Sequence, residues 1–270
     1  MPPRVGIGII TYNRRDIVAR TIARAREYTR YTPMALVVAD DGSTDGTPAM
    51  LRSLGVCCVT GPNRGIAWNK NRALYALVDQ LACNAVILLE DDTEPAAPGW
   101  EADWIAAVSR WGHVNYAAPW LRDRFLSGSG TVDDPVIGTS VTAQCAAFSR
   151  TALAAAGYFE PRFKGYGHEH VEHTSRLLHR GFGGHADMAD GTARSVFYLI
   201  DGNVVMREVP STWDAEQEAR NLQLAHELMR DKDRCPMPWR DDAEKAEFQA
   251  EIAAALAATP NPALIPNATI

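Results

Sequence analysis

Histidine and glutamate side chains are concentrated in one short stretch, "GYGHEHVEHTSR", at residues 165–176. Both residue types can transfer protons or bind a metal ion. Neither zinc-protease motif is formed, because Glu172 replaces the second histidine of H-E-x-x-H and Glu169 the first histidine of H-x-x-E-H. Three interpretations stay open: a metal pair of His170 and His173 on one helix face, a solvated polar helix start, or a catalytic acid/base cluster.

Four further polar clusters each follow a short apolar run of the sequence. They comprise Thr11, Tyr12, Asn13 and Arg14; Asp40 and Asp41; Asn63, Arg64 and Gly65; and Glu90, Asp91 and Asp92. One such turn after a strand is common, but four converging on one edge of a sheet indicate a ligand site. The glycines do not follow G-x-G-x-x-G, and G-x-x-x-x-G-K-[ST] does not occur, so dinucleotide-binding and P-loop sites are disfavoured.

The apolar runs before these clusters alternate with helical patterns. Short strands are predicted at 4–10, 35–38, 56–59 and 85–89, and helices at 16–28 and 67–82. This alternation is typical of a parallel sheet that helices cover on both faces. Because connections between parallel strands are right-handed, the carboxyl ends of the strands share one edge, where open α/β sheets bind ligands.

Composition narrows the class of protein. With 270 residues, 46% of them hydrophobic, the chain can bury the core of one α/β domain. A net charge of −6 disfavours nucleic-acid binding through phosphate contacts alone. The five cysteines lack paired metal-ligand spacing, which indicates a reduced, cytoplasmic setting. We find no signal peptide and no apolar run of about 18 residues, so we expect no integral membrane segment and leave peripheral membrane association open.

The ordered motifs resemble those of family 2 glycosyltransferases with the GT-A fold. The resemblance rests on "IITYNR", "VVADDGSTDGT", "PNRGIAWNKNRA", "LLEDDTEP", "AAFSRTALAAAGYFEPRF" and "GYGHEHVEHTSR", and it covers about residues 4–200. It implies a single α/β domain with a Rossmann-like, mostly parallel sheet flanked by helices. We expect a catalytic domain at 1–205, with a nucleotide-binding half at about 1–95 and an acceptor half at about 96–205, followed by a helical extension and irregular tail at 206–270.

The resemblance also implies a role for each matching residue. The nucleotide sugar would contact Thr11, Tyr12, Asn13, Arg14, Asp41, Asn63, Arg64, Gly65, Lys70 and Asp91, with Asp41 on the base, commonly uracil. Asp92 and Glu90 would belong to the D-x-D-type motif for Mn²⁺ or Mg²⁺, a hard cation that neutralises the departing diphosphate. His170 stands where the family has its catalytic aspartate, with Glu169 as the alternative base and Gly167, His168 and Glu172 on the acceptor side.

The implied reaction is an inverting, metal-dependent sugar transfer from a UDP-linked donor to an acceptor hydroxyl, which a base deprotonates opposite the leaving group. The acceptor stays open between a glycan, a lipid carrier, a small metabolite and a modified nucleobase. One alternative is a sugar-nucleotide nucleotidyltransferase, although its usual glycine-rich phosphate loop near the first strand is missing. The other is a non-catalytic nucleotide- or sugar-binding module, against which the intact "EDD" and "HEHVE" argue. Beyond residue 205, Ser211 is expected to cap a helix.

Overall fold

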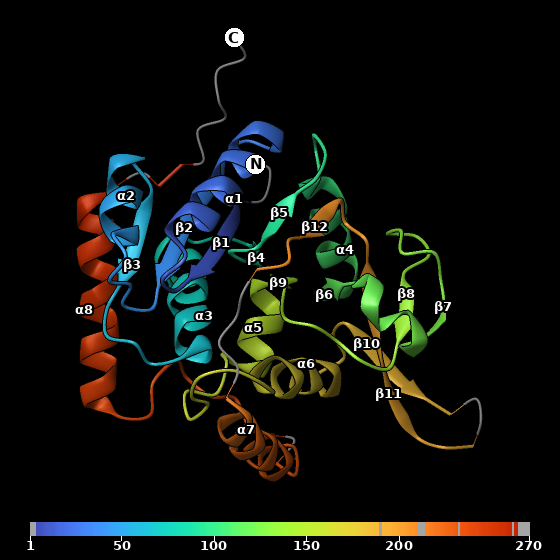
Figure 1. Ribbon diagram of the computed structural model, residues 1–270. Helices are drawn as coiled ribbons and strands as arrows, with labels where there is room; N and C mark the ends of the chain where they lie inside the picture. The colour runs from blue at the N-terminus through green and yellow to red at the C-terminus, as the bar shows by residue number, and fades with distance from the viewer. Residues whose placement is uncertain (1–3, 189–190, 210–213, 232, 261, 264–270) are drawn as a thin grey trace.

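Parallel strands form one half of the main sheet, as the sequence predicts. The computed structural model describes residues 4–188, 191–209, 214–231, 233–260 and 262–263 (Figure 1). The strands β1 (Val5–Thr11), β2 (Met34–Asp40), β3 (Cys57–Thr60) and β4 (Ala85–Glu90) pair in parallel in the order β3-β2-β1-β4. Their carboxyl ends therefore meet at one edge, where the polar clusters of the sequence are brought together.

Helices cover both faces of this sheet (Figure 1). They are α1 (Arg15–Tyr28), α2 (Thr47–Ser53), α3 (Ile66–Tyr75, continued by a π-helical turn at Ala76–Gln80), α4 (Glu101–Trp111), α5 (Arg150–Ala156), α6 (Glu169–His179), α7 (Ala215–Leu228) and α8 (Asp242–Ala258). Side chains alternate along a strand, so Ile7 and Ile9 enter the apolar cluster beneath α1 and α4, whereas Ile10 enters the opposite cluster with α3 and α8. Burial on both faces explains why these strands are continuously apolar.

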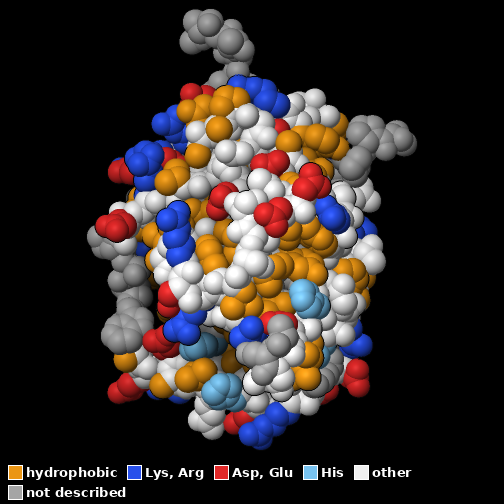
Figure 2. All heavy atoms as spheres, turned by 90° about the vertical axis from the view of Figure 1, so that its right-hand side faces the viewer, with side chains coloured by type: hydrophobic (Ala, Val, Ile, Leu, Met, Phe, Trp, Pro, Cys, Tyr) orange, Lys and Arg blue, Asp and Glu red, His pale blue; other side chains and the backbone are white. Residues whose placement is uncertain are grey.

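Antiparallel pairing begins at β9 (Cys145–Ser149), which lies between β4 and β6 (His113–Tyr116). The sheet continues through β11 (Arg194–Ile200), parallel to β6, and then through antiparallel β8 (Val136–Gly138) and β7 (Phe125–Ser127), while β10 (Gly184–Asp187) pairs with β11. A 3₁₀ helix spans Pro119–Arg124. On the face that carries β7, β8 and β11, apolar side chains occupy the middle and acidic side chains lie above them (Figure 2). The predicted single α/β domain is confirmed, with its parallel pairs mainly in the first half.

The C-terminal part of the chain is joined closely to the rest of the domain. Strand β12 (Val204–Met206) pairs with β5 (Thr93–Pro95), so the predicted boundary after residue 205 falls inside a strand. Asp214, rather than the predicted Ser211, caps α7 by accepting hydrogen bonds from two backbone N–H groups, and Ser211 lies outside the described residues. Helix α8 packs against β3, and Pro262 and Ala263 lie beside β2. The rest of the predicted irregular tail, 264–270, is outside the described residues.

Among the described residues, no helix is both long and apolar enough to cross a membrane. All five cysteines are free thiols. The thiols of Cys57 and Cys83 are buried, and burial raises the pKa of each to about 11.

Candidate active site

A cavity of about 680 Å³ opens at the carboxyl edge of β1, β2 and β4. It gathers residues from four separate strand ends. Those expected from the sequence that line it are Thr11, Tyr12, Arg14, Asp41, Asn63, Gly65, Glu90, Asp91 and Asp92. Parallel strand order places these segments at one edge although they span more than eighty positions of sequence.

The loop after β1 shapes one wall of the cavity. Tyr12 exposes 45% of its surface and faces the open space, where an aromatic ring is suited to stack on a planar ligand. Asn13 is left-handed (φ 52°) and does not line the cavity. Its Oδ1 accepts from the N–H of Thr44 at 2.8 Å, and its own N–H donates to Ser43 Oγ at 2.7 Å. Asn13 therefore joins this loop to the Asp-Gly-Ser turn, and its expected contact with the donor stays a prediction.

Asp41 is buried at the cavity wall and held from three directions. Its Oδ1 accepts from the backbone N–H of Arg64 at 3.0 Å, and its Oδ2 from that of Gly65 at 2.8 Å. The Arg72 guanidinium adds a third bond at 2.8 Å to Oδ1. Burial raises the pKa of Asp41, although these donors act in the opposite direction. A side chain at position 65 would bring its Cβ to 2.7 Å from the N of Gly165, so only glycine fits there.

Arg64 points away from the cavity, contrary to its expected place beside the nucleotide. Its guanidinium pairs with Glu247 and, at 3.4 Å, with Glu244, both on α8. The same group stacks over Trp68 at 4.5 Å from the ring centroid. Only the backbone of Arg64 reaches the site, through its bond to Asp41.

Two carboxylates of the "EDD" motif, Asp91 and Asp92, pair with the same guanidinium, that of Arg14. Arg14 Nη1 lies 2.9 Å from Asp91 Oδ1 and 3.1 Å from Asp92 Oδ2. Thr11 Oγ1 donates to the other oxygen of Asp91 at 2.7 Å. Burial raises the pKa of Asp91 to about 6, and the neighbouring Asp92 adds to this, whereas Arg14 lowers it. The two carboxylates concentrate negative charge at the cavity, and the single guanidinium of Arg14 balances only part of it.

A buried chain of charges leads from Glu90 to helix α6. Lys70 is 1% exposed, and its Nζ lies 2.9 Å from Glu169 Oε1 and 3.5 Å from Glu90 Oε1. His170 Nδ1 lies 3.5 Å from the same Glu169 oxygen. Burial alone would raise the pKa of Glu169, but Lys70 and His170 hold it well below the ordinary range. Lys70 was expected at the base or diphosphate; here it is behind the cavity wall, between two carboxylates.

Helix α6 confirms that "GYGHEHVEHTSR" begins a helix, but the solvated interpretation is wrong. Gly167 and His168 have positive φ angles of 102° and 69°, which turn the chain sharply into the helix. Glu172 is fully buried and pairs with Arg176 at 2.6 Å. It was expected on the acceptor side, and this structural ion pair gives it no access to a substrate. His168 faces Glu218 at 3.9 Å, outside the cavity.

Neither expected base lines the cavity directly. His170 is partly exposed, with 19% of its side chain accessible, and Glu169 is almost fully buried. His173 is buried and bonds through Nε2 to the carbonyl of Gly157 at 2.9 Å, so it does not pair with His170 on a common exposed face. Both Glu169 Oε2 and His170 Nδ1 are buried without a hydrogen-bond partner among the described residues.

Sequence reasoning missed the other residues that line this cavity. The additional lining residues are Ile10, Ile66, Asn69, Gln144, Gly165, Tyr166, Met206, Arg207, Glu208, Val209, Asp214 and Gln217. The segment from Met206 reaches the cavity because β12 pairs with β5 and because the N–H of Arg207 donates to the carbonyl of Asp92 at 2.8 Å. Strands of three residues leave no periodic signal, so these neighbours could not be found from the pattern.

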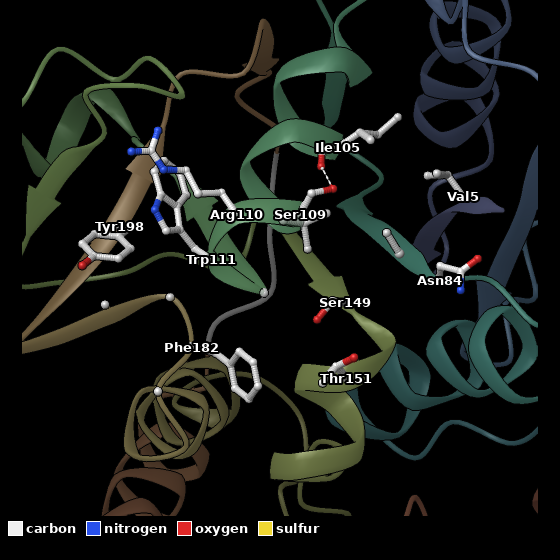
Figure 3. Close-up of a pocket in the computed structure, with 16 residues that line it drawn as sticks. Val5, Asn84, Ile105, Ser109, Arg110, Trp111, Ser149, Thr151, Phe182 and Tyr198 are labelled. Atoms are coloured by element: carbon white, nitrogen blue, oxygen red, sulfur yellow. Dashed lines mark hydrogen bonds between the residues drawn. The ribbon is translucent and has the colours of Figure 1, made fainter. Parts of the chain in front are cut away.

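A second cavity, of about 620 Å³, lies at the opposite, amino-terminal edge of β1 and β4. Figure 3 shows Arg110, Trp111 and Tyr198 at one end of it and Val5 and Asn84 at the other. Among the described residues that line it, Arg110 is the one charged side chain and none is a carboxylate. The acidic cavity at the carboxyl edge is therefore the candidate active site.

Carboxylates at the cavity are the candidate ligands of a cation. Within the described part of the chain, no three histidine, cysteine or acidic side chains are grouped closely enough to hold a metal ion by themselves. Asp91 and Asp92 offer hard oxygen donors at the cavity, and Glu90 Oε1 is buried without a hydrogen bond. Mg²⁺ and Mn²⁺ commonly take one or two carboxylates and complete their shell with substrate phosphates and water. The residues fit a cation that binds together with a diphosphate.

Comparison with known proteins identifies the class. Residues 7–107 match the family model described as glycosyl transferase family 2. The fold resembles a mannosyltransferase from Pyrobaculum calidifontis solved with GDP-Man and Mn²⁺ (21% identity, TM-score 0.61, covering 96% of this chain and 76% of that one). It also resembles GalNAc-T7 solved with UDP, GalNAc and Mn²⁺ (13%, 0.62, 93% and 54%). A third similar structure is glucosyl-3-phosphoglycerate synthase from Mycobacterium tuberculosis with Mn²⁺, UDP and glucosyl-3-phosphoglycerate (16%, 0.51, 87% and 81%). No curated protein sequence matches the chain significantly.

These findings confirm the resemblance seen in the motifs. Residues 7–107 are a family 2 glycosyltransferase domain, and the architecture of the described chain is the GT-A fold. The predicted enzyme class, a glycosyltransferase, is confirmed by the family match. At identities between 13% and 21%, the structural likeness establishes the fold alone.

Proposed function

We propose that the chain is an inverting glycosyltransferase that moves a sugar from a nucleoside-diphosphate donor, UDP-linked, to an acceptor hydroxyl. The observation that carries this proposal is the convergence of Tyr12, Asp41 and the Asp91–Asp92 pair around one cavity. These residues supply an aromatic face, a hydrogen-bond acceptor and a cation-binding pair, which are the features that a base and a diphosphate need. The structures solved with UDP or GDP-Man and with Mn²⁺ support the same class of donor.

The residues divide the work between donor and acceptor. Asp41 accepts a hydrogen bond from an N–H of the nucleobase, and Tyr12 stacks on the nucleobase or the ribose. Asp92, with Glu90 or Asp91, would hold Mn²⁺ or Mg²⁺. When bound, such a cation supplies positive charge to the leaving diphosphate. Arg14, already within 3.1 Å of both aspartates, balances the charge of this pair before a donor binds.

His170 is proposed as the base that accepts the proton of the acceptor hydroxyl. Neutral imidazole suits this role near neutral pH. Glu169, ionised and bonded to Lys70, is proposed to orient the histidine from 3.5 Å. A glutamate whose pKa is held this low is a weak base, which favours the histidine of the two. The acceptor stays open between a glycan, a lipid carrier, a small metabolite and a modified nucleobase, and the cytoplasmic setting stays a prediction.

A thermal-shift panel tests the donor. UDP, GDP, ADP and the corresponding nucleotide sugars are each added with and without Mn²⁺, and the melting point is measured. Binding to the folded state alone adds about 2.7 kcal/mol of stability at a hundredfold excess over Kd. We expect UDP to give the largest shift and Mn²⁺ to increase it. A larger shift with a purine diphosphate would make the uridine assignment wrong, and no shift with any of them would contradict the proposed function.

A further inference from the structure

Helix α8 lies against the edge strand β3 (Figure 1). The neighbouring strand β2 ends next to Asp41, the proposed partner of the nucleobase. Its Phe248 packs edge-on against Trp68 of α3, with ring centroids 5.2 Å apart. Glu244, Glu247 and Glu251 are spaced three and four residues apart, so they share one face of α8. That acidic face is directed at two arginines beside the cavity wall, Arg64 and Arg72.

The pair between Arg72 and Glu251 is the buried member of this set. Arg72 is fully buried, and its Nε and Nη2 donate to the two oxygens of Glu251 at 2.9 and 3.1 Å. The remaining Nη1 donates to Asp41 Oδ1 at 2.8 Å, and Nη2 also bonds to the carbonyl of Pro62 at 3.1 Å. A Cβ at Gly61 would come within 2.6 Å of Arg72 Nη2, so the loop leaves space for this contact only with glycine. The two-point bond to Glu251 fixes the plane of the guanidinium.

This arrangement determines how many acceptor positions Asp41 keeps for a ligand. A carboxylate offers about four lone-pair positions. Three of them are taken by the N–H groups of Arg64 and Gly65 and by one nitrogen of Arg72. Glu251 takes the Nε N–H and one N–H of Nη2, and the carbonyl of Pro62 takes the other N–H of Nη2, so Arg72 has only Nη1 left for Asp41. One position of Asp41 therefore remains for a donor from the cavity.

We propose that Glu251 is a positioning residue for recognition of the nucleobase. From helix α8, it holds Arg72 so that Asp41 keeps one acceptor position for an N–H of the nucleobase. This inference rests on the proposed function. Without the charge of Glu251, Arg72 is free to turn its fork onto Asp41 and take the last acceptor position. The nucleobase would then lose Asp41 as its hydrogen-bond acceptor, whereas binding of the diphosphate at Asp91 and Asp92 would not change.

The test compares Glu251→Gln with Glu247→Gln, which removes a charge from the same helix face but from a pair directed away from the cavity. Dissociation constants for UDP and for inorganic pyrophosphate, both with Mn²⁺, are measured by calorimetry. We expect Glu251→Gln to weaken UDP binding at least tenfold and to leave pyrophosphate binding unchanged. Glu247→Gln should leave both unchanged. Pyrophosphate, which has no base, separates a local loss of base recognition from general damage to the site.

Wild-type affinity for UDP in Glu251→Gln, or equal weakening of UDP and pyrophosphate, would overturn the proposal. If Glu251→Gln does not fold, Glu251→Asp takes its place, because the shorter carboxylate keeps the charge but cannot reach both nitrogens of Arg72. Weaker UDP binding with unchanged pyrophosphate binding is then expected, and unchanged UDP binding overturns the proposal. If the wild-type protein binds pyrophosphate but no nucleoside diphosphate, base recognition by Asp41 and its positioning by Glu251 are both wrong. If it binds neither, the proposed function itself fails.

Discussion

Replacing Lys70 with methionine removes the buried cation that lies between two carboxylates. Methionine keeps the length and the apolar stem of lysine, so the main loss is the charge. At 2.9 Å and an effective dielectric constant of about 20, the attraction between Lys70 and Glu169 is about 6 kcal/mol, and at 3.5 Å that with Glu90 is about 5 kcal/mol. Desolvation of the three groups cancels much of this, and removal of one partner from a buried pair typically costs about 3–5 kcal/mol.

We therefore expect Lys70→Met to lower the free energy of unfolding at pH 7 by about 3–5 kcal/mol. Urea unfolding followed by circular dichroism measures this value, with exposed Lys245→Met as the matched control. The sign of the pH dependence is also fixed. In the wild type, the low pKa of Glu169 gives a contribution that is present above its unfolded value and is lost as pH falls through the folded value. In the variant, an unpaired buried Glu169 has a raised pKa, so the deficit should shrink as pH falls from 7 to 5.

If Lys70→Met were as stable as Lys245→Met, the stabilising role of Lys70 between Glu169 of α6 and Glu90 of β4 would be refuted. A deficit that stays constant between pH 7 and pH 5 would refute it as well. The double variant with Glu169→Gln gives a further check, since it removes the second charge of the pair. It should recover part of the stability that Lys70→Met loses.

Other predictions follow from buried and acidic groups. Burial lowers the pKa of His113 to about 4, so the protein should lose stability as pH falls from about 6.5 to 4, by up to about 3 kcal/mol for this group. Unfolding of His113→Gln should show a correspondingly weaker pH dependence, while exposed His179→Gln should not. Asp92→Asn should retain its fold by circular dichroism but lose most metal-dependent transfer, and full activity after exhaustive chelation would contradict this. His170→Ala should abolish transfer without affecting stabilisation by UDP, and Glu169→Gln should lower turnover less; the reverse result would make the glutamate the base.

The positions of the strand-end clusters could be predicted because they depend on a local pattern and one general rule. Apolar runs that stop at Thr11, Asp40 and Glu90 define strands, and parallel order brings their ends together. The cavity-lining residues at these strand ends follow from that placement, whereas those between Met206 and Gln217 do not. This part of the prediction needed no knowledge of which side chains touch.

The directions of long charged side chains could not be predicted in the same way. Arg64, Lys70 and Glu172 were expected at the substrate, and each is instead held in an ion pair. Glu172 pairs with Arg176, one turn further along α6, whereas the partners of the other two are distant in sequence. The partner of Lys70 is Glu169, 99 positions away, and the partners of Arg64 are about 180 positions away on α8. A buried charge turns towards its counter-charge because desolvation is costly, and only the tertiary fold supplies that counter-charge.

Strand β2 is longer than β3, and Pro262 and Ala263 cover the part of its edge that β3 does not reach. Strand β3 pairs with β2 only from Val37 onward, so Met34, Ala35 and Leu36 of β2 have no strand beside them on that side among the described residues. The N–H of Leu36 instead donates to the carbonyl of Pro262 at 2.8 Å, and Ala263 bridges Ala35. An open strand edge is a template for pairing with another molecule, whereas proline has no N–H to extend such pairing. Shortening the chain to residue 260 should therefore promote self-association through β2 before it affects catalysis.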